Sequence, residues 1–149
     1  MEKNEIEILL VEDNLNDAEL TIRALRKNKV ANNLIHLKHG AEALDFLFGT
    51  GSYADRDPRS KPKVILLDLK MPKVDGIEVL KRIKVDEFTK KIPVVMLTSS
   101  KENPDIEKCY QLGANSYIQK PIDFDQFQKM IDDLGYYWLS VNQSLPLKA

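Results

Sequence analysis

The stretch VILLDLKMPKVDG, residues 64–76, decides the fold class of this chain. It begins with a continuous apolar run, which is typical of a strand covered on both faces. Asp68 follows the run without a break, and apolar residues at helical spacing then recur at Ile77, Leu80 and Ile83. A buried strand followed by a helix is the repeating unit of a parallel α/β sheet.

The same alternation of strand and helix recurs along the chain. Short apolar runs predict strands at 6–11, 34–37, 64–67, 94–97 and 117–118, with helical spacing between them. The fourth helix is expected to open with Asn103 as its N-cap before Pro104, and the fifth to start at Asp123 and end near Gly135. Residues 49–63 fit no element and predict a long loop. Together these patterns predict a parallel α/β sandwich.

Composition excludes several classes of protein. The chain has 149 residues, which fits one domain of about 100–200 residues. Its net charge of -1 argues against a nucleic-acid binder or a protein held on an anionic membrane. Cys109 has no second cysteine to pair with, and His36 and His39 are too few for the common zinc centres. With neither a signal peptide nor a membrane span at the N-terminus, we expect a soluble cytoplasmic protein.

Polar residues follow the predicted strands where chemistry is expected. In an open parallel sheet, ligands bind beyond the carboxyl ends of the strands. The residues at these positions are Glu12 and Asp13, Asp68, Thr98 and Ser99, and Lys120 with Pro121. Polar residues that follow a strand can instead cap the next helix. We prefer this interpretation for Asn14 or Asn16. A capping role does not suit Asp68, because this residue directly follows a buried strand.

The chemistry of these residue types points to phosphoryl transfer. Carboxylates gathered at one edge repel one another unless a cation neutralises them, and an oxygen-only ligand set favours Mg²⁺. A lysine suits a phosphoryl oxygen, a threonine hydroxyl adds a donor, and a carboxylate beside them is equipped to attack phosphorus. The sequence lacks a GxxxxGK[ST] loop, so the phosphoryl group is expected from another protein or a small donor rather than from bound ATP.

These residues resemble those of response-regulator receiver domains, the family of the chemotaxis protein CheY, from Ile6 to about Leu134. The matching motifs are VED at 11–13, DLKMPKVDG at 68–76, PVVMLTS at 93–99, GA at 113–114 and KP at 120–121. The resemblance implies a doubly wound (βα)5 sheet, five-stranded and parallel, in a flavodoxin-like, CheY-like α/β/α sandwich. It also implies a receiver domain at 1–134 and a C-terminal extension at 135–149, with no separate output domain.

The resemblance assigns roles to the site residues. Asp68 would accept a phosphoryl group from a sensor histidine kinase. Asp13, Asp68 and the backbone carbonyl of Lys70 would bind Mg²⁺, with Glu12 acting through water. Thr98 and Lys120 would hold the phosphoryl oxygens, and small Ser99 would leave room for the donor.

The resemblance also implies a switch. Thr98 would move toward the phosphate and let Tyr117 turn inward, which would remodel the surface for a downstream protein target. The Lys120–Pro121 bond is expected to be cis. The protein would be a signalling phosphoacceptor that assists its own phosphorylation and dephosphorylation, rather than an enzyme. Receiver domains more often carry Asn or another polar residue at the position of Lys70. The lysine is expected to change the rate at which the acyl phosphate hydrolyses.

A narrower resemblance is to the stand-alone, phytochrome-associated (Rcp-type) regulators. It rests on the 49–63 loop, the DLxxPxxDG pattern and the ending YWLS at 137–140 with Leu145 and Pro146. It implies a phytochrome-type kinase as partner and a homodimer formed by residues 136–145 with the fourth or fifth helix. The alternative is that this tail folds back over its own domain.

Three other functions are alternatives to this interpretation. A haloacid-dehalogenase-type Mg²⁺ phosphatase needs a second aspartate where Lys70 stands. A flavodoxin-like electron carrier needs a hydroxyl-rich phosphate loop where Glu12, Asp13 and Asn14 stand, and these acids would repel a cofactor phosphate. A phosphorylation-independent binding module would not need the full set of Asp13, Asp68, Thr98 and Lys120. The presence of all four residues argues against this function.

Overall fold

The computed structural model describes residues 6–27, 33–121 and 123–143. Strands and helices alternate in the order predicted. The strands are β1 (Ile8–Val11), β2 (Leu34–Leu37), β3 (Val64–Leu67), β4 (Val94–Thr98) and β5 (Ser116–Gln119). The helices are α1 (Leu15–Lys27), α2 (Gly40–Phe48), α3 (Gly76–Val85), α4 (Asn103–Gln111) and α5 (Phe124–Tyr136), with short helical turns η1 (Gly51–Tyr53), η2 (Thr89–Lys91) and η3 (Tyr137–Val141).

The strands form one parallel sheet in the order β2-β1-β3-β4-β5, which confirms the predicted fold class. Val11 lies beside Leu67, and Leu67 lies beside Met96. This register aligns the carboxyl ends of the central strands. The residues that follow β1 and β3 therefore meet at the same edge of the sheet.

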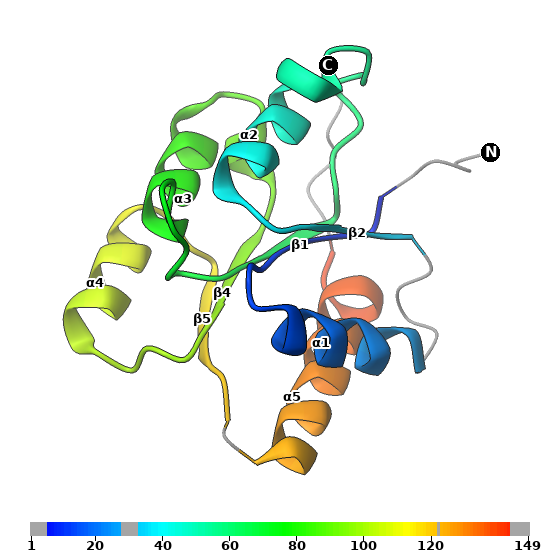
Figure 1. The fold of residues 1–149 in the computed structure, drawn as a ribbon, viewed down its shortest axis with the longest axis vertical. Helices are drawn as coiled ribbons and strands as arrows, with labels where there is room; N and C mark the ends of the chain where they lie inside the picture. The colour runs from blue at the N-terminus through cyan, green and yellow to red at the C-terminus, as the bar shows by residue number, and fades with distance from the viewer. Residues whose placement is uncertain (1–5, 28–32, 122, 144–149) are drawn as a thin grey trace.

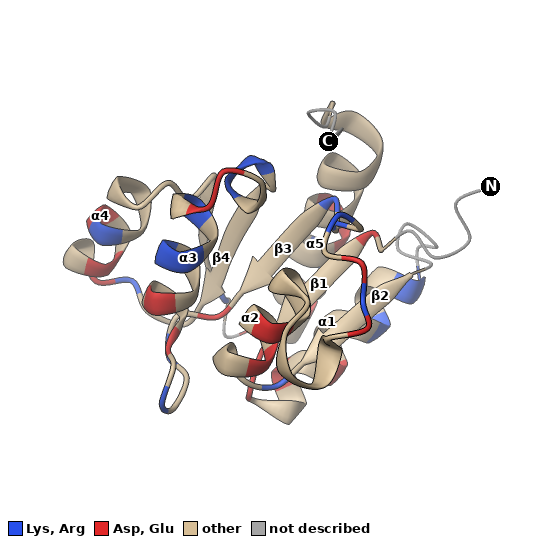
Figure 2. Ribbon diagram, turned by 90° about the horizontal axis from the view of Figure 1, so that it is seen from above, with Lys and Arg blue, Asp and Glu red and all other residues tan. Residues whose placement is uncertain are grey.

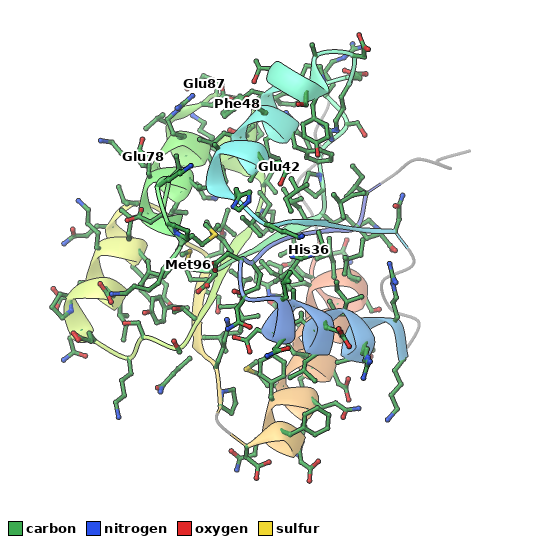
Figure 3. All side chains as sticks on the ribbon, in the orientation of Figure 1. His36, Glu42, Phe48, Glu78, Glu87 and Met96 are labelled. Atoms are coloured by element: carbon green, nitrogen blue, oxygen red, sulfur yellow. The ribbon has the colours of Figure 1, made fainter. Side chains whose placement is uncertain are left out.

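Helices cover both faces of the sheet (Figure 1): α1 and α5 lie on one face, and α2, α3 and α4 on the other. The central strands are buried on both faces, so Leu66 packs toward α1 and α5 while Leu67 packs toward α2 and α3. Side chains fill the space on each side, including Met96 of β4 (Figure 3), which is fully buried. This two-sided burial explains the continuous apolar runs.

The surface helices carry mixed charge. Basic and acidic residues alternate along α3 and α4 in the ribbon of Figure 2. In the part of the chain that the structure describes, no helix combines the length and apolar character needed to cross a membrane.

The 49–63 loop is held against α2. It contains the short turn η1, which the sequence pattern did not predict. Arg56 stacks its guanidinium 3.8 Å from the centre of the Phe46 ring and donates to the Phe46 carbonyl at 2.7 Å. Lys61 donates to the Leu47 carbonyl at 2.9 Å. The two cations satisfy carbonyl groups at the C-terminal end of α2, where a helix leaves acceptors unpaired.

Three local predictions were wrong. The N-cap of α4 is Glu102, so Asn103 lies inside the helix. Helix α5 passes through Gly135 and continues into the π-helical turn η3, because Trp138 and Leu139 of that turn pack on the core formed by α1 and α5. The Lys120–Pro121 bond is trans, the isomer that X–Pro bonds favour by about 0.5–1 kcal/mol.

Gly76 allows the start of α3 to lie directly against the residue that follows β3. Its N–H donates to the Leu69 carbonyl at 2.8 Å, and the side chain of the N-cap Asp75 accepts from Glu78. A Cβ on Gly76 would lie 2.1 Å from the carbonyl oxygen of Asp68 and 2.8 Å from the Cα of Leu69. Both atoms belong to the backbone, so they cannot move aside cheaply.

We expect Gly76→Ala to lower the free energy of unfolding by about 1–3 kcal/mol, because the added methyl group overpacks this contact. Chemical denaturation followed by circular dichroism measures the change. A variant as stable as the wild-type protein would contradict this account of the close approach.

Candidate functional site

Three carboxylates gather at the carboxyl ends of β1 and β3. Glu12, Asp13 and Asp68 each place a carboxylate oxygen within 4.8 Å of the others. The Asp68 N–H donates to the Val11 carbonyl at 3.0 Å and the Glu12 N–H donates to the Leu37 carbonyl at 3.1 Å. The sheet's hydrogen bonding thus extends one residue beyond the strands and fixes the backbone of both acids. The prediction that these acids lie together is confirmed.

Glu12 is the most deeply buried member of the cluster. Only 2% of its surface is exposed, against 8% for Asp68. Its carbonyl accepts a hydrogen bond from Nε2 of His36 at 2.9 Å (Figure 3 labels this histidine), and its carboxylate accepts from the Asn14 N–H at 3.2 Å. The side chain of Asn14 also accepts from the Asp17 N–H at 3.0 Å, so of the two candidate asparagines Asn14 is the one that caps α1.

Lys120 supplies the positive charge of the site. It follows β5, and its N–H donates to the Thr98 carbonyl at 2.7 Å, which continues the β4–β5 pairing. Its ammonium Nζ lies 2.5 Å from Oε1 of Glu12 and 2.9 Å from Oδ2 of Asp17. The lysine therefore lies among the acids as predicted, but it pairs with Glu12 and Asp17.

The burial of the cluster alters its ionisation. Burial raises the pKa of Glu12 to about 7; the hydrogen bond from Lys120 opposes this rise and the charge of Asp68 adds to it. Burial would lower the pKa of Lys120, but its hydrogen bond to Glu12 and the charge of Asp68 outweigh burial and raise it. The raised pKa favours the protonated, positively charged form of Lys120 at this edge of the sheet.

The donor set fits a hard divalent cation. The cluster offers carboxylate oxygens from Glu12, Asp13 and Asp68, which are the ligands that Mg²⁺ and Mn²⁺ prefer. One ammonium group cannot neutralise three carboxylates, so a dication at this position would relieve their repulsion. The exposed side chain of Lys70 pairs with Asp105, with 3.8 Å between Nζ and Oδ2.

The two predicted switch residues meet at Ser100. Thr98 is fully buried at the end of β4, and its Oγ1 accepts from the Ser100 N–H at 3.3 Å. Tyr117 is half-buried, and its hydroxyl donates to the Ser100 carbonyl at 2.9 Å. The β4–α4 loop thus connects the threonine at the site with the tyrosine of β5.

Sequence reasoning missed two residues that the structure brings to the site. Asp17 binds Lys120, and Asp105 accepts from the Ser100 hydroxyl at 2.5 Å. The signal for Asp17 is its place in the first turn of the helix that follows Glu12 and Asp13, which puts it near the same edge of the sheet. No comparable signal marked Asp105.

Comparison with known proteins identifies related sequences. The family model described as the response regulator receiver domain matches residues 8–132. The probable methanogenesis regulatory protein FilR2 of Methanothrix harundinacea is 40% identical over 137 residues, which are 92% of this chain and 86% of that protein. The response regulator Rcp1 of Synechocystis is 40% identical over 132 residues, 89% of this chain and 88% of Rcp1.

Solved structures agree with the sequence relatives. The phosphorylated cyanobacterial phytochrome response regulator RcpA matches with a TM-score of 0.88 and 37% identity, covering 95% of this chain and 99% of RcpA. The Mn²⁺-bound form of Rcp1 matches with a TM-score of 0.87 and 36% identity, covering 95% and 99%. The chain therefore belongs to the response regulator receiver family and is a receiver-domain protein of two-component signalling.

Proposed function

We propose that Asp68 accepts a phosphoryl group from a sensor histidine kinase in the cytoplasm. The observation that carries this proposal is the position of Asp68. It is nearly buried at the end of β3, within 4.8 Å of two further carboxylates, and its charge acts on Lys120. Thr98 ends the neighbouring strand β4. A carboxylate nucleophile, a hydroxyl donor and an ammonium group thus share one edge of the sheet.

Transfer to Asp68 forms one bond and breaks one bond. A carboxylate oxygen of Asp68 attacks the phosphorus, the P–N bond to the kinase histidine breaks, and the electron pair leaves with the imidazole nitrogen. With acetyl phosphate as the donor, the P–O bond breaks instead and acetate leaves. The product in both cases is an acyl phosphate on Asp68. The ammonium of Lys120 and the hydroxyl of Thr98 would hold its oxygens, so the protein assists its own phosphorylation and dephosphorylation.

The cation at this site is proposed to be Mg²⁺, held by Asp13, Asp68 and the backbone carbonyl of Lys70, with Glu12 acting through water. When bound, Mg²⁺ would neutralise charge on the carboxylates and on the phosphoryl oxygens. The oxygen-only donor set supports this assignment. The Mn²⁺ in the Rcp1 structure also supports a divalent ion.

Thr98 and Tyr117 are proposed to carry the signal outward. The Thr98 hydroxyl would donate to a phosphoryl oxygen, and its Oγ1 already accepts from the Ser100 N–H at 3.3 Å. A movement of Thr98 toward the phosphoryl group would therefore pull on the contact with Ser100. Ser100 also holds the Tyr117 hydroxyl. Phosphorylation would therefore alter the contacts of Ser100 with Thr98 and Tyr117, and the β4–α4 loop would have two states with different contacts. A switch requires contacts that differ between its states. The remodelled surface would bind a downstream protein.

A phytochrome-type kinase is the proposed partner. RcpA is a cyanobacterial phytochrome response regulator, and it matches this chain over nearly its full length. FilR2, at the same identity as Rcp1, is a probable methanogenesis regulatory protein, so the proposal depends on the structural likeness to RcpA.

We expect Asp68→Asn to remove phosphorylation, because an amide cannot form the acyl phosphate. Intact-mass spectrometry after incubation with acetyl phosphate and Mg²⁺ detects the adduct. The wild-type protein and the control Asp133→Asn, an exposed acid of α5, should each gain one phosphoryl group. An adduct on Asp68→Asn equal to that of the wild-type protein would refute the assignment.

We expect Asp13→Asn to weaken Mg²⁺ binding by about tenfold or more, because a hard-cation site loses one anionic ligand. Isothermal titration calorimetry measures the affinity. Glu19→Gln is the matched control, since Glu19 pairs with Arg23 on the exposed face of α1. Unchanged binding by Asp13→Asn would place the metal elsewhere.

A homodimer is proposed through α5 and η3. The structure divides the aromatic tail into two sets. Trp138 and Leu139 pack inward, whereas Tyr136, Tyr137 and Val141 are 59%, 48% and 47% exposed. A groove of about 490 Å³ beside β5 is lined by Ile118, Met130, Tyr137 and Trp138 among others. Such aromatic surface is enriched at protein interfaces, and a second copy would meet it with twofold symmetry. Residues 144 and 145 of the predicted interface lie outside the described residues.

Replacement of Tyr136, Tyr137 and Val141 by serine should convert the dimer into a monomer at tens of micromolar, because it removes exposed apolar surface and leaves the inward-facing residues in place. Sedimentation velocity measures the mass. Val85→Ser, at an exposed position of α3, should remain dimeric. A wild-type protein that sediments as a monomer, or a triple variant that remains dimeric, would reject the interface.

A further inference from the structure

Asp17 lies beside Lys120 although 103 residues separate them in the chain. It occupies the first turn of α1, where its N–H donates to Oδ1 of Asn14 at 3.0 Å and its carbonyl accepts from the Thr21 hydroxyl at 2.8 Å. These contacts use the backbone of Asp17. Its carboxylate is the part that reaches the site, with Oδ2 2.9 Å from Nζ of Lys120.

The two carboxylates that bind Lys120 differ in burial. The side chain of Glu12 is 2% exposed, and that of Asp17 is 34% exposed. Release of Glu12 would leave a buried charge without a partner, which is costly. Release of Asp17 costs less, because water can solvate its carboxylate. Asp17 also lines an open groove of about 300 Å³ together with Ser99, Lys120 and Phe124, so a released carboxylate faces solvent.

An ammonium group has three N–H donors, and two of those on Lys120 are directed to carboxylates. The third N–H can meet one oxygen of a phosphoryl group on Asp68, and the further anionic oxygens of that group compete with the carboxylates for the same cation. The contact that yields is the one with the exposed partner. We propose that Asp17 is a positioning residue for phosphoryl transfer: it holds the Lys120 ammonium in the unphosphorylated protein and yields it to a phosphoryl oxygen.

This inference rests on the proposed function, since it requires that Lys120 contacts the phosphoryl group. The sign of the change in phosphoryl binding when Asp17 is neutralised follows from the charges. Asp17 competes with the phosphoryl oxygens for Lys120, and its negative charge opposes theirs. Neutralisation of Asp17 should therefore strengthen phosphoryl binding, whereas neutralisation of a metal ligand should weaken it.

The test uses beryllofluoride with Mg²⁺, a stable mimic of a phosphoryl group on a carboxylate, titrated into the full chain and followed by ¹⁹F NMR. Asp17→Asn should bind it about two- to fivefold more tightly than the wild-type protein, as expected for loss of one partly exposed ion pair. Asp17→Glu keeps the charge and should restore the wild-type affinity. A purely structural role on α1 would not produce this pattern.

Glu19→Gln removes one charge from the same helix without touching Lys120, and it should leave the affinity unchanged. Thermal unfolding verifies that each variant is folded, and Asp17→Ser provides a second neutral variant. The inference is overturned if both neutral variants bind beryllofluoride no more tightly than the wild-type protein, or if Glu19→Gln gains as much. Failure of the proposed function is distinguishable, because the wild-type protein itself would then bind no beryllofluoride.

Discussion

The buried pairing of Lys120 with its carboxylates is the interaction on which the site depends. The Lys120–Glu12 contact joins residues 108 positions apart and ties the end of β5 to the end of β1. A charge at this depth is tolerated only when a partner satisfies it, so each group fixes the other in place. The same pairing balances part of the repulsion among Glu12, Asp13 and Asp68. It thereby lets three acids occupy one edge of the sheet.

A second set of contacts leads from this edge to the surface. The carbonyl of Ser100 accepts a hydrogen bond from the Tyr117 hydroxyl, and its N–H donates one to Oγ1 of Thr98. The Ser100 hydroxyl donates to the carboxylate of Asp105. Asp105 in turn pairs with Lys70, which lies two residues after Asp68. The loops after β3 and β4 are therefore connected through side chains. In the proposed switch, these contacts would link a change at Asp68 to α4 and β5.

Much of the fold and of the acidic cluster could be predicted from the sequence, because both depend on local pattern. Continuous apolar runs indicated strands buried on both faces, and parallel strands place their carboxyl ends at one edge. Glu12, Asp13 and Asp68 could thus be grouped before their distances were known. The predicted end of α5 failed because tertiary packing outweighed a local preference. Gly135 is a poor helix residue, yet the packing of Trp138 and Leu139 carries the helix past it.

The sequence by itself determined the order of strands and helices and the chemical types present at the strand ends. Only the tertiary structure decided which of these groups are partners. The sequence places Asp17 near the site but does not show that it binds Lys120, because this contact depends on how the start of α1 lies relative to the end of β5. The division of the tail into inward and exposed residues has the same origin. Periodicity describes what one segment repeats, whereas ion pairing and burial depend on distances between segments that the fold alone sets.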